Sequence, residues 1–276
     1  MLMKNYTITD GNVRAVILPE KGATAISLQK DGQEFLYCWE ENLNSPERPR
    51  CGIPFLFPTF GRMAAETYRW NDTDYHMAIH GFAHTSVWNV ESHSENTLVL
   101  TLEGPIDGCY PFAFLVRLTF RIEDGHLVIR QDYENQGQEP MPYAFGFHPY
   151  FLLDKLEHAR VHAVADARID FSTGKLLPFG SGTVTLEEPV NAPEVGAALA
   201  GLKSPVVLEI PDEKRKLTME FSPDFPQLVL WHPKNAAFLC VEPINGSPNG
   251  FNTGNHHTLA PGEKKTVSLS VYPEIM

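Results

Sequence analysis

The 276-residue chain has few cysteines, fewer basic than acidic residues and no long apolar run. Its four cysteines, Cys38, Cys51, Cys109 and Cys240, are widely spaced and lack the Cys-x-x-Cys pairing of a zinc or redox site. We expect free thiols, as in a reducing cytosol. The net charge of -12 disfavours binding to phosphate backbones and anionic lipids, and no apolar run approaches the roughly 20 residues of a membrane span. The sequence therefore predicts a cytoplasmic protein that binds neither nucleic acid nor membranes.

Helical periodicity is almost absent, and the chain has no glycine-rich phosphate loop and no Gly-x-Ser-x-Gly nucleophile motif. It has instead 20 glycines and 22 prolines among many short β-prone runs. In residues 114–122, apolar and polar side chains alternate, which is typical of a half-buried strand. Asp31-Gly32 and Asp124-Gly125 predict hairpin turns, because both central positions tolerate positive φ.

These patterns predict an all-β fold. Strands are expected at residues 13–18, 23–28, 34–37, 68–70, 75–77, 85–90, 97–102, 114–122, 126–133, 206–210, 216–221, 228–231, 236–241 and 265–272. A short helix is expected at 193–202 and an exposed loop at 38–50. Because no linker, repeat or composition shift divides the chain, we predict one large antiparallel β-sandwich domain over residues 1–276, with very little helix.

One ionisable side chain, His148, lies in an aromatic stretch at residues 143–151, which reads Tyr-Ala-Phe-Gly-Phe-His-Pro-Tyr-Phe. Desolvation lowers the pKa of a histidine, so a buried imidazole is protonated near neutral pH only if a carboxylate supports it. The best candidate partner is Glu242, which follows an apolar run that predicts a buried strand. Such an acid and base indicate proton transfer at both ends of one bond. The alternative is that both are polar groups satisfied within the core.

Two further side chains are candidates for ligand binding. Residues 51–62 form an apolar passage whose prolines exclude an interior helix, and its last residue, Arg62, faces either a ligand or solvent. The spacing of His76, His80 and His84 would give a metal-binding face on a helix. A glycine and a preceding turn argue against a helix here, so we expect no metal site. His80 is then either a site residue or a structural histidine.

Four short motifs occur together in this chain. They are Gly61-Arg62, His80-Gly-Phe-Ala, Gly146-Phe-His148-Pro-Tyr-Phe and Cys240-Val-Glu-Pro243. In this order they resemble the aldose 1-epimerase (galactose mutarotase-like) superfamily, and residues 228–243 look most like its bacterial LacX-type branch. The resemblance covers nearly the whole chain. It implies a β-supersandwich fold with a sugar-binding cleft. It also implies a cofactor-independent isomerase. We expect this protein to be a monomer or homodimer.

The resemblance also implies residue roles. His148 falls on the family's general acid and Glu242 on its general base, while His80 and Arg62 fall on groups that hold sugar hydroxyls. The carboxylate would remove the C1 hydroxyl proton while the imidazolium protonates the ring oxygen, so that the C1–O5 bond opens and recloses as the other anomer. The aromatic side chains expected to pack against the sugar are Phe147, Tyr150 and Trp231.

Departures from the family pattern bear on the substrate. The hexose-6-phosphate branch usually has arginine directly after His-Gly-Phe-Ala, whereas this chain has His84. This difference favours a free aldose, although Arg50, Arg69 or His84 itself could bind a phosphate. The aspartate that galactose mutarotases use on the substrate has no clear counterpart, and Asp170 is one candidate.

Other functions compete with an epimerase of free aldoses. A carbohydrate-binding or regulatory protein would keep the cleft but has no need of a paired acid and base. A hexose-6-phosphate 1-epimerase would require basic side chains beside the sugar. A metal-dependent β-sandwich enzyme would use several of the histidines.

Overall fold

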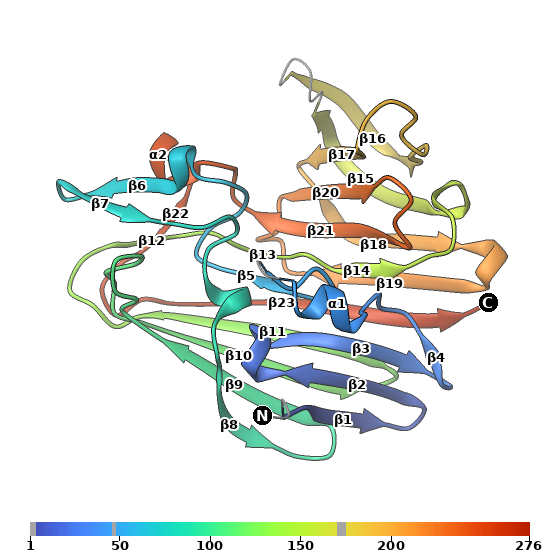
Figure 1. The fold of residues 1–276 in the computed structure, drawn as a ribbon, viewed down its shortest axis with the longest axis horizontal. Coiled ribbons are helices and arrows are strands. Elements are labelled where there is room, and N and C mark those ends of the chain that lie inside the picture. The colour runs from blue at the N-terminus through green and yellow to red at the C-terminus, as the bar shows by residue number, and fades with distance from the viewer. Residues whose placement is uncertain (1–3, 46–47, 170–174) are drawn as a thin grey trace.

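The computed structural model describes residues 4–45, 48–169 and 175–276, which consist mainly of antiparallel strands (Figure 1). The largest sheet has 15 strands. Thirteen follow the spatial order β5 (Phe55–Leu56), β13 (Phe145–Phe147), β21 (Phe238–Asn245), β20 (Gln227–Pro233), β17 (Glu194–Ala200), β15 (Arg160–Ile169), β18 (Lys203–Ile210), β19 (Arg215–Phe221), β23 (Lys264–Ile275), β11 (His126–Asn135), β10 (Phe114–Glu123), β9 (Thr97–Glu103) and β8 (Asn89–His93). In addition, β14 (Tyr150–Leu152) pairs with β21, and β16 (Leu176–Val184) pairs with β15.

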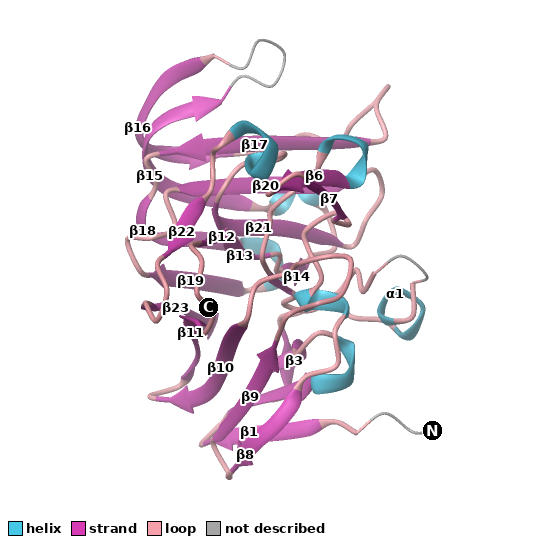
Figure 2. Ribbon diagram, turned by 90° about the vertical axis from the view of Figure 1, so that its left-hand side faces the viewer, coloured by secondary structure: helices cyan, strands magenta, loops and turns pink. Residues whose placement is uncertain are grey.

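A four-stranded sheet packs against one end of the large sheet (Figure 2). Its strands are β1 (Tyr6–Asp10), β2 (Val13–Leu18), β3 (Thr24–Lys30) and β4 (Gln33–Glu34). Two small pairs are β6 (Thr67–Trp70) with β7 (Thr73–His76), and β12 (Met141–Tyr143) with β22 (His257–Leu259). The α-helices of the described chain are single turns, α1 (Glu40–Leu43) and α2 (Gly250–Thr253). The predicted all-β sandwich with very little helix is therefore confirmed.

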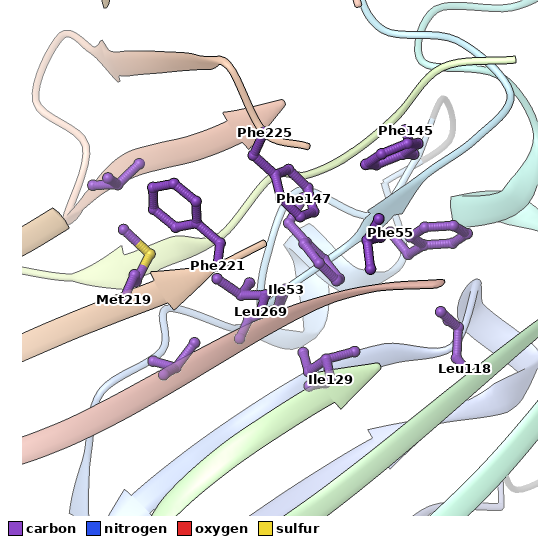
Figure 3. Close-up of a cluster of buried hydrophobic side chains, with 14 of the residues drawn as sticks. Ile53, Phe55, Leu118, Ile129, Phe145, Phe147, Met219, Phe221, Phe225 and Leu269 are labelled. Atoms are coloured by element: carbon purple, nitrogen blue, oxygen red, sulfur yellow. The ribbon is translucent and has the colours of Figure 1, made fainter. Parts of the chain in front are cut away.

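One buried hydrophobic cluster joins the two sheets. It includes Ile8 and Leu28 of the small sheet together with Leu118 and Leu269 of the large one. Figure 3 shows part of it, where aromatic rings from β5 and β13 lie near aliphatic side chains from β11 and β23. Each fully buried side chain of this kind contributes about 1.5–3 kcal/mol relative to its exposed state. This cluster supports the strands that carry the site described below.

The predicted helix at residues 193–202 is wrong. The segment contains strand β17, whose residues pair with β20 on one side and partly with β15 on the other. Its alanines favour a helix by only tenths of a kcal/mol per residue, and hydrogen bonding to neighbouring strands overrides so small a preference. The change matters because β17 begins at Glu194, next to the strand that carries Trp231.

Of the other local predictions, the two hairpin turns are confirmed, whereas one loop and one strand differ from the expected bounds. The Asp31-Gly32 and Asp124-Gly125 turns connect β3 to β4 and β10 to β11, as predicted. The expected loop at 38–50 contains the single turn α1, and the strand expected at 85–90 begins only at Asn89, after a 3-10 turn at Ala83–Thr85. Within the described residues, no helix has the length and apolar character needed to cross a membrane.

Candidate active site

A cavity of about 360 Å³, within the size range of small-molecule sites, contains all five predicted site residues. These are Arg62, His80, His148, Trp231 and Glu242. Six further residues line it, namely Arg48, Arg50, Phe60, Ile79, Glu194 and Val229. The predicted residues come from separate parts of the sequence. Strand pairing in the large sheet brings His148, Trp231 and Glu242 together, whereas Arg62 and His80 lie in loops outside its strands.

Strand register places His148 opposite Glu242. The strands β13 and β14 both pair with β21, with Gly146 opposite Ile244 and Tyr150 opposite Cys240. His148 lies between these two pairs and therefore next to Glu242, with 3.6 Å between His148 Nε2 and Glu242 Oε1. Both side chains are almost fully buried.

The His148 ring is held by its neighbours. Its backbone N–H donates to the Pro54 carbonyl at 3.1 Å. The imidazole stacks on Tyr150 with a centroid distance of 4.8 Å and an interplanar angle of 9°, and it meets Trp231 edge to face at 5.9 Å. Aromatic contacts of this kind restrict the ring to one orientation, with Nε2 directed at the carboxyl group of Glu242.

Burial favours the neutral form of both members of the pair. It raises the pKa of Glu242 well above its usual value, an effect that the Arg48 guanidinium partly opposes. Burial, reinforced by the charge of Arg48, lowers the pKa of His148 to about 3. A protonated carboxyl beside a neutral imidazole holds as many protons as a carboxylate beside an imidazolium. One internal proton transfer therefore converts the neutral pair into the charged pair.

His80 is fixed by reciprocal contacts with Gly61. The His80 backbone N–H donates to the Gly61 carbonyl at 2.9 Å, and His80 Nδ1 accepts from the Gly61 N–H at 3.2 Å. Burial and the neighbouring His148 lower the pKa of His80 well below its usual value. The neutral ring then carries its proton on Nε2, as a hydrogen-bond donor. Glycine is required at position 81, where φ is +77° and a Cβ atom would lie 2.2 Å from the Phe57 carbonyl oxygen.

Three arginines line the cavity. The Arg62 side chain is 63% exposed and pairs with Glu66 at 3.3 Å. Arg48 and Arg50 come from the segment before β5. The sequence identified Arg50 as one phosphate-binding candidate but missed Arg48, because residues in an irregular segment have no periodicity that indicates their direction. The other candidate, Arg69, is absent from the cavity lining and pairs with carboxylates at its own hairpin.

A second carboxylate, that of Glu194, lines the cavity next to Trp231. The Trp231 indole N–H donates to Glu194 Oε2 at 2.8 Å. The sequence did not identify Glu194 because its segment was expected to be helical, and no motif surrounds it. The aromatic side chains that line the cavity also differ in part from those expected to pack against the sugar. Phe147 packs in the core and Tyr150 lies against the His148 ring, while Phe60 lines the cavity together with Trp231.

The other predicted polar residues lie elsewhere. His76 ends strand β7, His80 has a left-handed backbone and His84 lies in a 3-10 turn, so the three do not share a helix face. His84 is buried, with its ring centroid 6.2 Å from that of His80, and it does not line the cavity. Asp170 lies outside the described residues.

One group of described side chains has metal-ligating atoms within 4.8 Å of one another, namely His148, Cys240 and Glu242. It includes the predicted acid–base pair. Burial raises the pKa of the Cys240 thiol well above its usual value, so this thiol is protonated unless a bound cation displaces its proton.

Comparison with known proteins identifies the family of this chain. The aldose 1-epimerase family model matches residues 4–272, so the chain belongs to that family. The chain is 25% identical over 244 residues to Escherichia coli K12 YphB, described only as uncharacterised, and the match covers 79% of this chain and 82% of YphB.

Solved structures extend the likeness to the fold. The Slr1438 protein from Synechocystis sp. PCC 6803 matches with a TM-score of 0.88 and 25% identity, over 100% of this chain and 97% of the other. A galactose mutarotase-like protein from Lactobacillus casei matches with a TM-score of 0.83 and 23% identity, over 98% and 100%. The expected galactose mutarotase-like sandwich is therefore confirmed.

Proposed function

We propose that the protein is a cofactor-independent aldose 1-epimerase that interconverts the α and β anomers of a free aldose. The observation that carries the proposal is the approach of His148 to within 3.6 Å of Glu242 in a cavity lined by aromatic and hydrogen-bonding side chains. Membership of the aldose 1-epimerase family supports the reaction class.

We also infer one domain over residues 1–276, because one buried cluster joins both sheets.

Proton transfer within the pair prepares the reaction. Once its proton has moved to His148, the Glu242 carboxylate takes the proton of the C1 hydroxyl, and the His148 imidazolium gives a proton to the ring oxygen. The C1–O5 bond breaks to give the open-chain aldehyde. Rotation about C1–C2 and closure with the proton transfers reversed give the other anomer.

The remaining cavity residues hold the sugar. His80 Nε2–H and the Arg62 guanidinium donate to hydroxyls, and Glu194 accepts from another hydroxyl while it holds Trp231. The rings of Trp231 and Phe60 cover the C–H face of the sugar. Placement of the two reacting oxygens beside a fixed acid and base supplies the orientation that proton transfer requires.

The proposal is tested by following anomer equilibration with saturation-transfer NMR for glucose, galactose and xylose, with and without the protein. Exchange between the anomers should be faster with protein for at least one sugar, and the sugar with the largest acceleration is the best substrate of the three. If all three sugars bind but exchange at the spontaneous rate, the protein is a carbohydrate-binding protein and the proposal is wrong.

We expect turnover to be independent of pH from about pH 4, above the lowered pKa of His148, up to the raised pKa of Glu242. His148 stays neutral above its pKa of about 3, and Glu242 stays protonated below its raised pKa. The pair therefore keeps one transferable proton throughout this range. The measurement is kcat/KM against pH, after subtraction of the spontaneous rate. A decline in kcat/KM as the pH falls, centred near 6.5, the usual pKa of histidine, would show that His148 titrates as an ordinary imidazole.

A second candidate substrate is an aldose with an anionic group, such as a hexose 6-phosphate. It is favoured by the presence of Arg48, Arg50 and Arg62 around one cavity. The test is the ratio of kcat/KM for glucose 6-phosphate to that for glucose. A free-aldose enzyme should have a similar ratio in wild type and Arg50→Gln, whereas an enzyme for anionic sugars should lose roughly tenfold or more in this ratio. Arg69→Gln is the matched control, since Arg69 does not line the cavity.

A further inference from the structure

Two of the four free cysteines are in contact. Cys38 Sγ and Cys51 Sγ are 2.6 Å apart, about half an ångström more than the length of a disulfide bond. The other two sulfurs have different surroundings. Cys109 Sγ lies 3.9 Å from Met77 Sδ, and Cys240 is fully buried beside the candidate acid–base pair. This pairing was not predictable from the sequence, because the two cysteines are separated by twelve residues without a motif.

Backbone hydrogen bonds fix the chain beside both cysteines. The Gly52 N–H donates to the Tyr37 carbonyl, the Tyr37 N–H to the Tyr150 carbonyl, and the Tyr150 N–H to the Gly52 carbonyl, each at 2.8 Å. These bonds hold the residues next to Cys38 and Cys51 beside each other, and the two sulfurs already lie 2.6 Å apart. A bond between the sulfurs therefore needs only a small movement of the side chains.

The two thiols differ in their access to solvent. Cys38 is half-buried, whereas Cys51 is fully buried. The contact with Cys38, together with burial, raises the pKa of Cys51 above its usual range. A reagent from solvent therefore meets Cys38 first, with Cys51 directly behind it to complete the reaction.

We propose that Cys38 and Cys51 form a thiol–disulfide modification site that reacts with low-molecular-weight disulfides such as oxidised glutathione. The Cys38 thiolate attacks one glutathione sulfur, which gives a mixed disulfide and one reduced glutathione. Cys51 then loses its proton and attacks the Cys38 sulfur, which forms the Cys38–Cys51 bond and releases the second reduced glutathione. Two protein thiols are oxidised, and one glutathione disulfide is reduced to two thiols.

The bond would close the base of the segment that supplies Arg48 and Arg50 to the cavity. The formation of the disulfide does not depend on the proposed function. Only the statement that these arginines line a sugar-binding cavity rests on it. Closure restricts the chain between the cysteines mainly by removing conformations of the unfolded state, so oxidation should raise the thermal midpoint by roughly 5 °C. Amide exchange in residues 39–45 should slow as well, because the ends of this segment are then covalently joined.

The experiment treats the whole protein with oxidised glutathione, alkylates the remaining thiols under denaturing conditions and maps tryptic peptides by mass spectrometry. Trypsin cleaves after Lys30, Arg50 and Arg62, so the two cysteines fall on different peptides. The expected product is a linked pair of these peptides, with Cys109 and Cys240 alkylated. Stable glutathione adducts at Cys38 with Cys51 still alkylated would overturn the proposal, as would links to Cys109 or Cys240.

Two variants complete the test. Cys51→Ser should accumulate the glutathione adduct at Cys38 and lose the increase in thermal midpoint, whereas Cys109→Ser should behave as wild type. Unchanged amide exchange in residues 39–45 after oxidation would overturn the inferred restriction of the segment. These readouts do not depend on sugar turnover. A linked pair in a protein without epimerase activity would therefore refute the proposed function but not the modification site.

Discussion

Replacement of Glu242 by glutamine is expected to lower turnover by about a hundredfold to ten-thousandfold. Glutamine has nearly the same size and keeps a hydrogen-bonding oxygen, but it can neither supply a proton to His148 nor accept one from the C1 hydroxyl. The measurement is the rate of anomer exchange by saturation-transfer NMR on the best sugar of the panel. Turnover at the wild-type rate would show that Glu242 is a polar core group without a chemical role.

The same variant should be more stable than wild type at neutral pH. Burial raises the pKa of Glu242, so above about pH 4.5 the unfolded chain releases a proton that the folded chain retains. Wild-type stability therefore falls as the pH rises through this range, and glutamine removes that loss. The thermal midpoints of both proteins should diverge as the pH rises from about 4.5 toward the raised pKa of Glu242, with Glu242→Gln higher. A difference that does not change with pH would contradict the raised pKa of Glu242.

A loss of similar size, about a hundredfold to ten-thousandfold, is expected for His148→Ala. The variant removes the group that exchanges protons with Glu242 and leaves a ring-sized space beside Tyr150 and Trp231. Added imidazole should restore part of the turnover by occupying this space. Rescue distinguishes a chemical role from a purely structural one, because free imidazole does not rebuild lost packing between strands.

His84→Gln is the matched control for His148→Ala. Both histidines are buried, and burial lowers the pKa of each to about 3. Only His148 lines the cavity. Turnover should therefore survive in His84→Gln, even if the thermal midpoint falls. If both variants lost turnover equally and imidazole rescued neither, the loss would reflect damage to the fold rather than removal of a catalytic group.

Features that depend on local sequence were predictable. Alternation of side chains indicated β10, and the Asp-Gly pairs located two hairpin turns that the structure contains. The aromatic surroundings of His148 and the apolar run before Glu242 indicated two buried titratable groups, and both are almost fully buried. In each case a few neighbouring residues carry the relevant physical information.

Features that depend on pairing across the fold were not predictable in the same way. The proximity of His148 to Glu242 was a hypothesis until the register of β13 and β14 on β21 was known. Glu194 enters the cavity because its segment pairs with β20, against a local preference for helix. Arg48 likewise lies in the cavity for reasons that irregular local sequence does not encode.

The measurement that tests the central claim most directly is anomer exchange of one sugar by wild type, Glu242→Gln and His148→Ala under identical conditions. The account predicts acceleration by wild type and near-spontaneous exchange with either variant, while all three proteins unfold cooperatively and bind the sugar. Acceleration that persists in both variants would contradict an acid–base mechanism at this pair.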